Sequence, residues 1–103
     1  MTRPLQCATA LSLSIALMGH AAMLGLGCTF GRYSAIRQQL VLRDDWHGET
    51  ATVVISRTGL PHFRYELGAV SSPAFGRRVT RLLRAFARET QAPLMPTLAV
   101  QAA

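Results

Sequence analysis

The sequence has no lysine, few acidic residues and only two cysteines. Its 11 basic residues are therefore all arginines, and with 5 acidic residues they give a net charge of +6. This balance favours contacts with anionic surfaces such as lipid headgroups, acidic protein patches or nucleic acid. Because genome composition alone can replace lysine with arginine, we do not take the missing lysine as a nucleic-acid signature.

The scarcity of cysteine excludes a disulfide framework. Cys7 and Cys28 flank an apolar segment. If that segment is helical, it holds the two residues roughly 30 Å apart, whereas a disulfide needs Cα atoms within about 7 Å of each other.

Catalytic and cofactor-binding motifs are also missing. There is no glycine-rich phosphate loop and no nucleophile elbow. The spacing of Asp44, Asp45, His47 and Glu49 matches no metal signature, so we interpret this cluster as a solvated turn. Without the apolar start, about 75 residues remain, which is enough for one small domain. We therefore predict a protein that is not an enzyme, with no catalytic residue, metal site, cofactor or small-molecule substrate.

An uncharged stretch of 21 residues, Ala8 to Cys28, dominates the N-terminal part of the chain. As a helix it spans about 31 Å, the thickness of the hydrocarbon core of a bilayer. We expect residues 1–28 to be an uncleaved anchor in a bacterial inner membrane, with the following domain in the periplasm. The alternatives are a signal peptide cleaved after Ala21 and a lipoprotein modified at Cys28. The topology stays open, because the arginines after the segment favour a cytoplasmic domain by the positive-inside rule.

One face of this expected helix is small and polar. It consists of Ser12, Ala16, His20 and Gly27. An ionisable group such as His20 inside a membrane usually faces a partner or a cavity. We expect this face to bind a membrane helix of a partner complex.

The remaining residues predict a small α+β sandwich of helix, strand, strand and helix, at residues 33–96. Helical spacing predicts a short helix from Tyr33 to Leu42, and alternation predicts strands at 50–56 and 62–70. Ser72 and Pro73 begin a second helix, which we expect to end near Glu89. Residues 97–103 form either a short third strand or a tail, and we expect Trp46 to complete the core.

The second helix is the clearest amphipathic element. Its apolar stripe holds Phe75, Val79, Leu82, Leu83 and Phe86. The opposite side is either the ordinary exposed surface of a packed helix or a surface that binds anionic lipid or phosphate groups, and it is formed by Arg77, Arg78, Arg81, Arg84 and Arg88. Because no aromatic side chain accompanies these arginines, nucleic acid is the less favoured partner.

The stretch from Tyr33 to Pro96 resembles the TonB/TolA carboxy-terminal domain family. The resemblance is carried by Tyr33-Ser34-Ala35-Ile36-Arg37, which is similar to the family's Tyr-x-x-x-Ile-Arg, and by the Thr/Val-rich run at 50–55, Ser-Ser at 71–72 and Ala-Pro-x-x-Pro at 92–96. An anchor containing a histidine, here His20, is also similar to that of TonB proteins. The resemblance implies the fold more than energy transduction, because the family's proline-rich spacer is missing.

These features together predict a membrane-tethered interaction protein that acts as a small adaptor or accessory subunit. We expect it to pair an open sheet edge with a segment of its partner. The alternative is an arginine-rich protein that binds membrane surfaces or nucleic acid.

Overall fold

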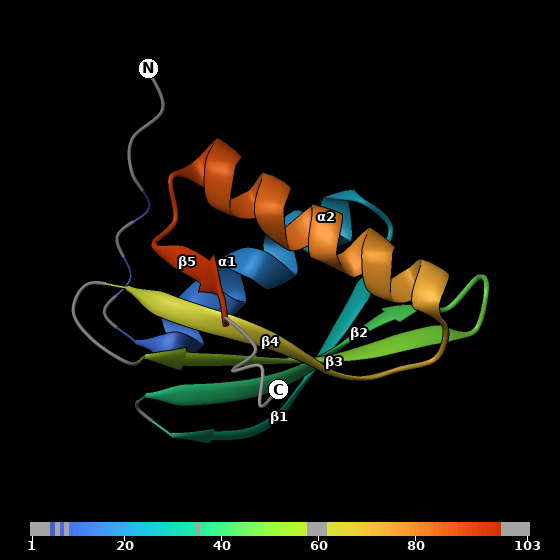
Figure 1. Cartoon of the computed structure of the whole chain (residues 1–103), viewed down its shortest axis with the longest axis horizontal. Helices are drawn as coiled ribbons and strands as arrows, with labels where there is room; N and C mark the ends of the chain where they lie inside the picture. Colours follow the sequence, from blue (N-terminus) through green and yellow to red (C-terminus); the bar gives the residue numbers. More distant parts are fainter. Residues whose placement is uncertain (1–4, 6, 8, 35, 58–61, 98–103) are drawn as a thin grey trace, which may run out of the picture.

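Five strands form one sheet, and two helices cover one of its faces in the computed structural model (Figure 1). The structure describes residues 5, 7, 9–34, 36–57 and 62–97. The α+β class is therefore confirmed. In chain order the elements are α1 (Ala10–Met23), β1 (Gly27–Ser34), β2 (Arg37–Asp44), β3 (Glu49–Arg57), β4 (Phe63–Val70), α2 (Pro73–Thr90) and β5 (Leu94–Pro96).

The strands lie in the order β1-β2-β3-β4-β5. The first four follow one another as antiparallel neighbours. Because α2 carries the chain back across the sheet, β5 lies parallel to β4. It pairs with only the first three residues of β4, which run from Phe63 to Tyr65.

The core lies between the inner face of the sheet and the two helices. Alternate residues of β2, β3 and β4 point into it, and burial alternates along β2 and along the first residues of β4. Helix α1 packs on β1, β2 and β3, while α2 packs on β3 and β4. The largest fully buried apolar side chains are Phe63, Phe86, Leu13, Leu17, Leu40, Leu42, Ile55 and Leu83.

The predicted strands at 50–56 and 62–70 and the predicted helix at 73–89 correspond to β3, β4 and α2. The Ser72 side chain caps α2 by accepting a hydrogen bond from the Phe75 N–H at 3.1 Å. All five residues of the predicted apolar stripe of α2 are buried. These predictions succeed because each element combines a regular apolar period with a clear start signal.

The predicted helix from Tyr33 to Leu42 is wrong, since these residues belong to β1, β2 and the turn between them. Tyr33 and Ile36 are exposed, whereas Gln38, Leu40 and Leu42 are buried in alternation. Tyr33, Ile36 and Leu40, which are spaced by three and four residues, therefore lie along a hairpin and not on one face of a helix. This hairpin adds two strands to the sheet that the sequence pattern did not predict.

The structure does not support the predicted membrane helix over 8–28. Helix α1 begins after the Thr9 cap and ends at Met23, before Gly25, whose φ of 79° lies in the left-handed region. Residues 27 and 28 already belong to β1. Among the described residues, no helix combines the length and apolar character needed to cross a membrane. The apolar stripe of α1 instead packs into the core through Ala10, Leu13, Leu17 and Ala21.

Two smaller predictions also need comment. Trp46 does not complete the core, because it is 90% exposed in the turn between β2 and β3. The last strand of the sheet, β5, forms at Leu94–Pro96, where no strand was predicted. The predicted strand at 97–103 falls largely on residues 98–103, outside the described part of the chain.

Burial of α1 predicts a large loss of stability in a Leu17→Ala variant. Leu17 is fully buried, so the substitution removes apolar contacts and leaves a cavity. We expect the free energy of unfolding, measured by urea denaturation, to fall by about 3 kcal/mol. The control is Ile15→Ala on the half-exposed side of the same helix, which should cost less than about 1 kcal/mol. Equal, small losses in both variants would contradict the packing of α1 on the sheet.

Candidate docking groove

The edge of β4 is only partly covered. Its first three residues pair with β5, and the ladder ends where the Thr97 N–H donates to the Tyr65 carbonyl oxygen at 2.7 Å. Strand β4 continues from Glu66 to Val70. Within the described residues, no strand lies beside this part of β4 on its outer side. A free edge of this kind offers backbone groups to another extended chain.

A groove runs along this free edge, between β4 and α2, with a volume of about 650 Å³. A second hollow continues it toward Pro96 and shares Leu67, Thr80 and Arg84 with it. We name the first hollow the docking groove. Its lining residues are Leu67, Gly68, Val70, Pro73, Gly76, Arg77, Thr80, Arg81 and Arg84.

A β-bulge gives the docking groove its apolar floor. Leu67 pairs with Val53 and Val70 pairs with Ala51, so two residues of β4 stand opposite one residue of β3. Since Val53 and Ala51 are both buried on the inner face, Leu67 and Val70 also point toward the helix side. Regular alternation would turn Val70 to the other face of the sheet.

The absence of a side chain at Gly76 keeps the floor open. A Cβ atom there would lie 3.6 Å from the methyl carbons of Val70, an ordinary van der Waals distance. Any larger side chain would extend toward Val70 and into the groove. The helix therefore approaches β4 closely at this point without filling the hollow.

Three exposed arginines form the basic rim of the groove. Arg77, Arg81 and Arg84 lie along one side of α2, and Arg88 continues their row by one turn. The ion pairs found among the described residues involve Arg43, His47 and Arg78, and so include none of this row. The rim is therefore a surface of positive charge without a carboxylate partner in the described part of the chain.

Arg78 does not belong to this rim, although the sequence pattern grouped it with the other four arginines. Its guanidinium donates to Asp44 at 2.6 Å, and it also lies over the Phe75 ring. Because Arg78 is rotated about 100° from Arg77 around the helix axis, it points toward the turn between β2 and β3 instead.

Asp44 is the centre of a polar cluster that holds this turn against α2. It is only 5% exposed, and it accepts hydrogen bonds from Arg78, from the His47 ring at 2.9 Å and from two backbone N–H groups. Beside this cluster, the hydroxyl of Ser72, the cap of α2, donates to the carboxylate of Glu49 at the start of β3. The predicted solvated turn is thus correct for Asp45 and His47, which are exposed, but wrong for Asp44.

The polar groups of this cluster are bonded to one another. The described residues contain no group of three or more side chains that could hold a metal ion. Ser72 acts as a helix cap, because its hydroxyl oxygen accepts a hydrogen bond from the Phe75 N–H while its O–H donates one to Glu49. The arrangement accounts for the position of the turn and of the first turn of α2.

The polar face predicted on the N-terminal helix is divided in the structure. Ser12 closes the capping box with Thr9, and the His20 ring packs edge-on against Phe86 of α2 at 5.4 Å between centroids. Gly27 does not share this face, because it lies on β1 after the end of α1. In this fold His20 therefore faces the second helix of its own chain.

Searches among protein-family models, curated proteins and solved structures found no match to this chain. The assignment of a function therefore depends on the groove and the charges described above.

The Asp44 cluster predicts a specific pH dependence of stability. The pKa of Asp44 is lowered from 3.8 to about 2, first by the hydrogen bond from His47 and then by that from Arg78. A carboxyl with a lowered pKa contributes stability above about pH 4 and loses this contribution as the pH falls through about 2. We expect Asp44→Asn to be less stable than wild type at neutral pH, with the difference shrinking between about pH 4 and pH 2 in urea denaturation.

The control for this prediction is Asp45→Asn, since Asp45 is exposed in the same turn. Its effect should be small throughout the pH range. A stability difference for Asp44→Asn that stays constant from neutral pH to pH 2 would contradict the role assigned to the ionised carboxylate.

Proposed function

We propose that this chain is a protein-interaction module that binds an extended, acidic segment of a partner protein in the docking groove. The partner segment adds as a strand to the free edge of β4 beyond β5. The observation that carries this proposal is a strand edge, Glu66 to Val70, that no strand of the described residues covers, beside a helix whose exposed side is a row of arginines.

The backbone supports strand addition at a defined position. The Phe63 N–H donates to Pro93, and the Tyr65 carbonyl accepts from Thr97, both across the β4–β5 edge. Because backbone groups point to the same edge at every second residue, the N–H and C=O of Leu67 point to this edge as well. A partner strand can therefore continue the ladder from the residue where β5 stops.

The side chains support an acidic occupant. Alternate residues of a docked strand face α2, above the apolar floor formed by Leu67 and Val70. Carboxylates at these positions come within reach of Arg77, Arg81 and Arg84. Arginine forks bind carboxylates through two parallel hydrogen bonds, so an acidic strand complements the rim and the net charge of +6.

An adaptor or accessory role in a TonB/TolA-like system, the periplasmic location and membrane attachment remain predictions. A membrane partner bound through the face around His20 requires α1 to leave the sheet, because His20 packs on Phe86 and Leu17 is buried. The docking groove does not require this change, since α1 contributes no residue to it.

The exposed row from Arg77 to Arg88 also favours a second candidate function, binding to anionic membrane surfaces. Binding of that kind depends on charge alone and falls steeply as salt rises. Strand addition depends in addition on backbone hydrogen bonds, which allows the two functions to be separated.

The direct test uses the full chain and a short synthetic peptide of alternating glutamate and valine. We expect measurable binding by calorimetry and about a tenfold loss of affinity when Arg77, Arg81 and Arg84 are replaced by Gln, because three exposed ion pairs are lost. The matched control replaces Arg32, Arg37 and Arg64 by Gln, which removes the same charge from the opposite face of the sheet and should leave the affinity unchanged.

Two further peptides test the mode of binding. A version N-methylated at every second residue cannot pair fully with β4 and should bind much more weakly, and a lysine–valine version should not bind. If the methylated peptide binds as well as the parent peptide, or if both triple variants lose affinity equally, strand addition in the groove is wrong. Vesicles containing phosphatidylglycerol that bind better than the acidic peptide would instead favour the membrane-surface function.

A further inference from the structure

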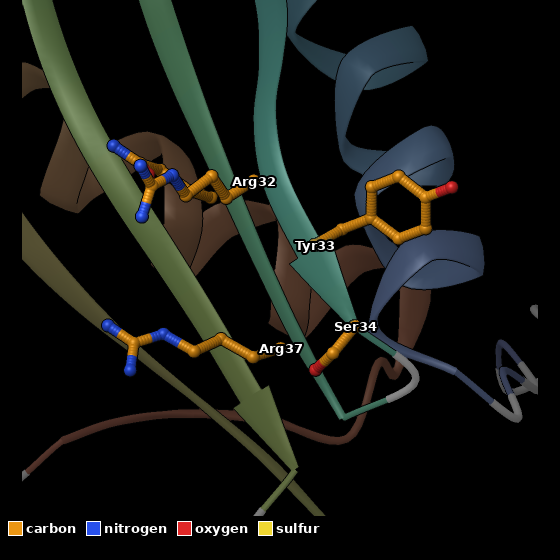
Figure 2. Close-up of a pocket in the computed structure, with 5 residues that line it drawn as sticks. Arg32, Tyr33, Ser34 and Arg37 are labelled. Atoms are coloured by element: carbon orange, nitrogen blue, oxygen red, sulfur yellow. The ribbon is translucent and has the colours of Figure 1, made fainter.

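Another hollow, separate from the docking groove and its continuation, lies at the opposite edge of the sheet, where β1 and β2 meet. Its volume is about 420 Å³. Figure 2 shows the side chains of Arg32 and Arg37 extending in the same direction from these two strands, while the ring of Tyr33 points to the other side. The hollow is thus on the face of the sheet that carries neither helix. Its lining residues are Arg32, Tyr33, Ser34, Arg37 and Gln39.

A β-bulge brings the two arginines to the same face. Between Phe30 and Tyr33, two residues of β1 stand opposite the single residue Gln39 of β2. In a regular strand Arg32 would point to the inner face together with Phe30. The bulge turns Arg32 outward, next to Gln39, two residues from Arg37.

The buried residue Gln38 supports this irregular backbone from the inner side. Its Nε2 donates to the carbonyl oxygen of Gln39 at 2.7 Å and approaches that of Gly31, in the bulge, at 3.5 Å. Gln38 is fully buried, so its side chain reaches these two carbonyl groups from the inner side of the sheet. The position of Arg32 is therefore built into the fold rather than set by a mobile surface loop.

The hollow presents hydrogen-bond donors and positive charge. Arg37 pairs with Ser34, which places Arg32 diagonally across from it, about 7–8 Å away at Cβ. The ion pairs formed among the described residues include neither arginine, and no carboxylate lines the hollow. Two positive charges on neighbouring strands repel each other, and an anion bound between them lowers that cost.

We propose that this hollow binds a phosphate group, carried by a phosphorylated small molecule or by a phospholipid headgroup. A single arginine fork satisfies a carboxylate, whereas a phosphate has several oxygens that accept from two guanidinium groups at once. The hydroxyl of Ser34 and the amide of Gln39 supply further donors at the same place. This site is independent of the docking groove, which lies along β4 and shares no residue with it.

The test measures binding of glycerol 3-phosphate to the full chain by calorimetry, and of phosphatidylcholine vesicles with and without phosphatidic acid by co-sedimentation. We expect the wild-type chain to bind at least one of these two probes. The Arg32→Gln/Arg37→Gln variant should bind that probe with at least about a tenfold lower affinity. The matched control, Arg43→Gln/Arg64→Gln, removes the same charge from β2 and β4 at positions that line neither hollow, and it should bind as wild type does. Arg32→Lys/Arg37→Lys keeps the charge but not the forks, and its affinity should be intermediate.

Each outcome decides the proposal. Binding of glycerol 3-phosphate that depends on the Arg32 and Arg37 pair identifies a soluble phosphate ligand. Binding only to phosphatidic acid vesicles, with the same dependence, identifies a lipid headgroup. No binding of either probe by the wild-type chain, or an equal loss in both double glutamine variants, would overturn it. Thermal denaturation shows whether each variant is folded. If Arg32→Gln/Arg37→Gln does not fold, Arg32→Lys/Arg37→Lys takes its place in the test.

Discussion

Both helices have to lie on the same face of the sheet, because only that face is apolar along β2, β3 and β4. Helix α1 covers the side of β1 and β2, and α2 covers the side of β4 (Figure 1). Burial of these two helix stripes against one sheet face is the main source of stability in so small a domain. The opposite face is left to polar and charged side chains, including Arg37, Gln39 and Arg64.

The two candidate sites lie at the two edges of the sheet, formed by β4 with its short neighbour β5 and by β1. At one edge, β5 has only three residues, so α2 overhangs a part of β4 that carries no further strand among the described residues. At the other end of the sheet, β1 contains a bulge that turns Arg32 to the open face. In both places a bulge changes which side chains share a face: Val70 joins the groove floor, and Arg32 joins Arg37.

Three regular elements, β3, β4 and α2, could be predicted from the sequence, whereas β1, β2 and the two bulges could not. The period of Phe75, Val79 and Leu83, together with the Ser72 cap, predicts α2 and its arginine side correctly. In contrast, Tyr33 and Ile36 fit a helical period only by coincidence, because their spacing spans a tight turn between two strands.

The N-terminal segment shows a different limit of sequence patterns. An apolar stretch without charge suits a lipid bilayer as well as a sheet face, and composition does not distinguish the two environments. The end of α1 before Gly25 depends on a backbone conformation, and the burial of Leu17 depends on contacts with distant strands. The groove depends likewise on a bulge and on a short β5, neither of which leaves a periodic signal.

Amide hydrogen exchange of the full chain, with and without the acidic glutamate–valine peptide, tests the central claim most directly. The account predicts that the backbone amide of Leu67 exchanges rapidly in the free chain and becomes protected when the peptide binds, while amides in β1 do not change. Protection that is spread evenly over the surface, or confined to β1, would contradict docking of an extended segment along β4.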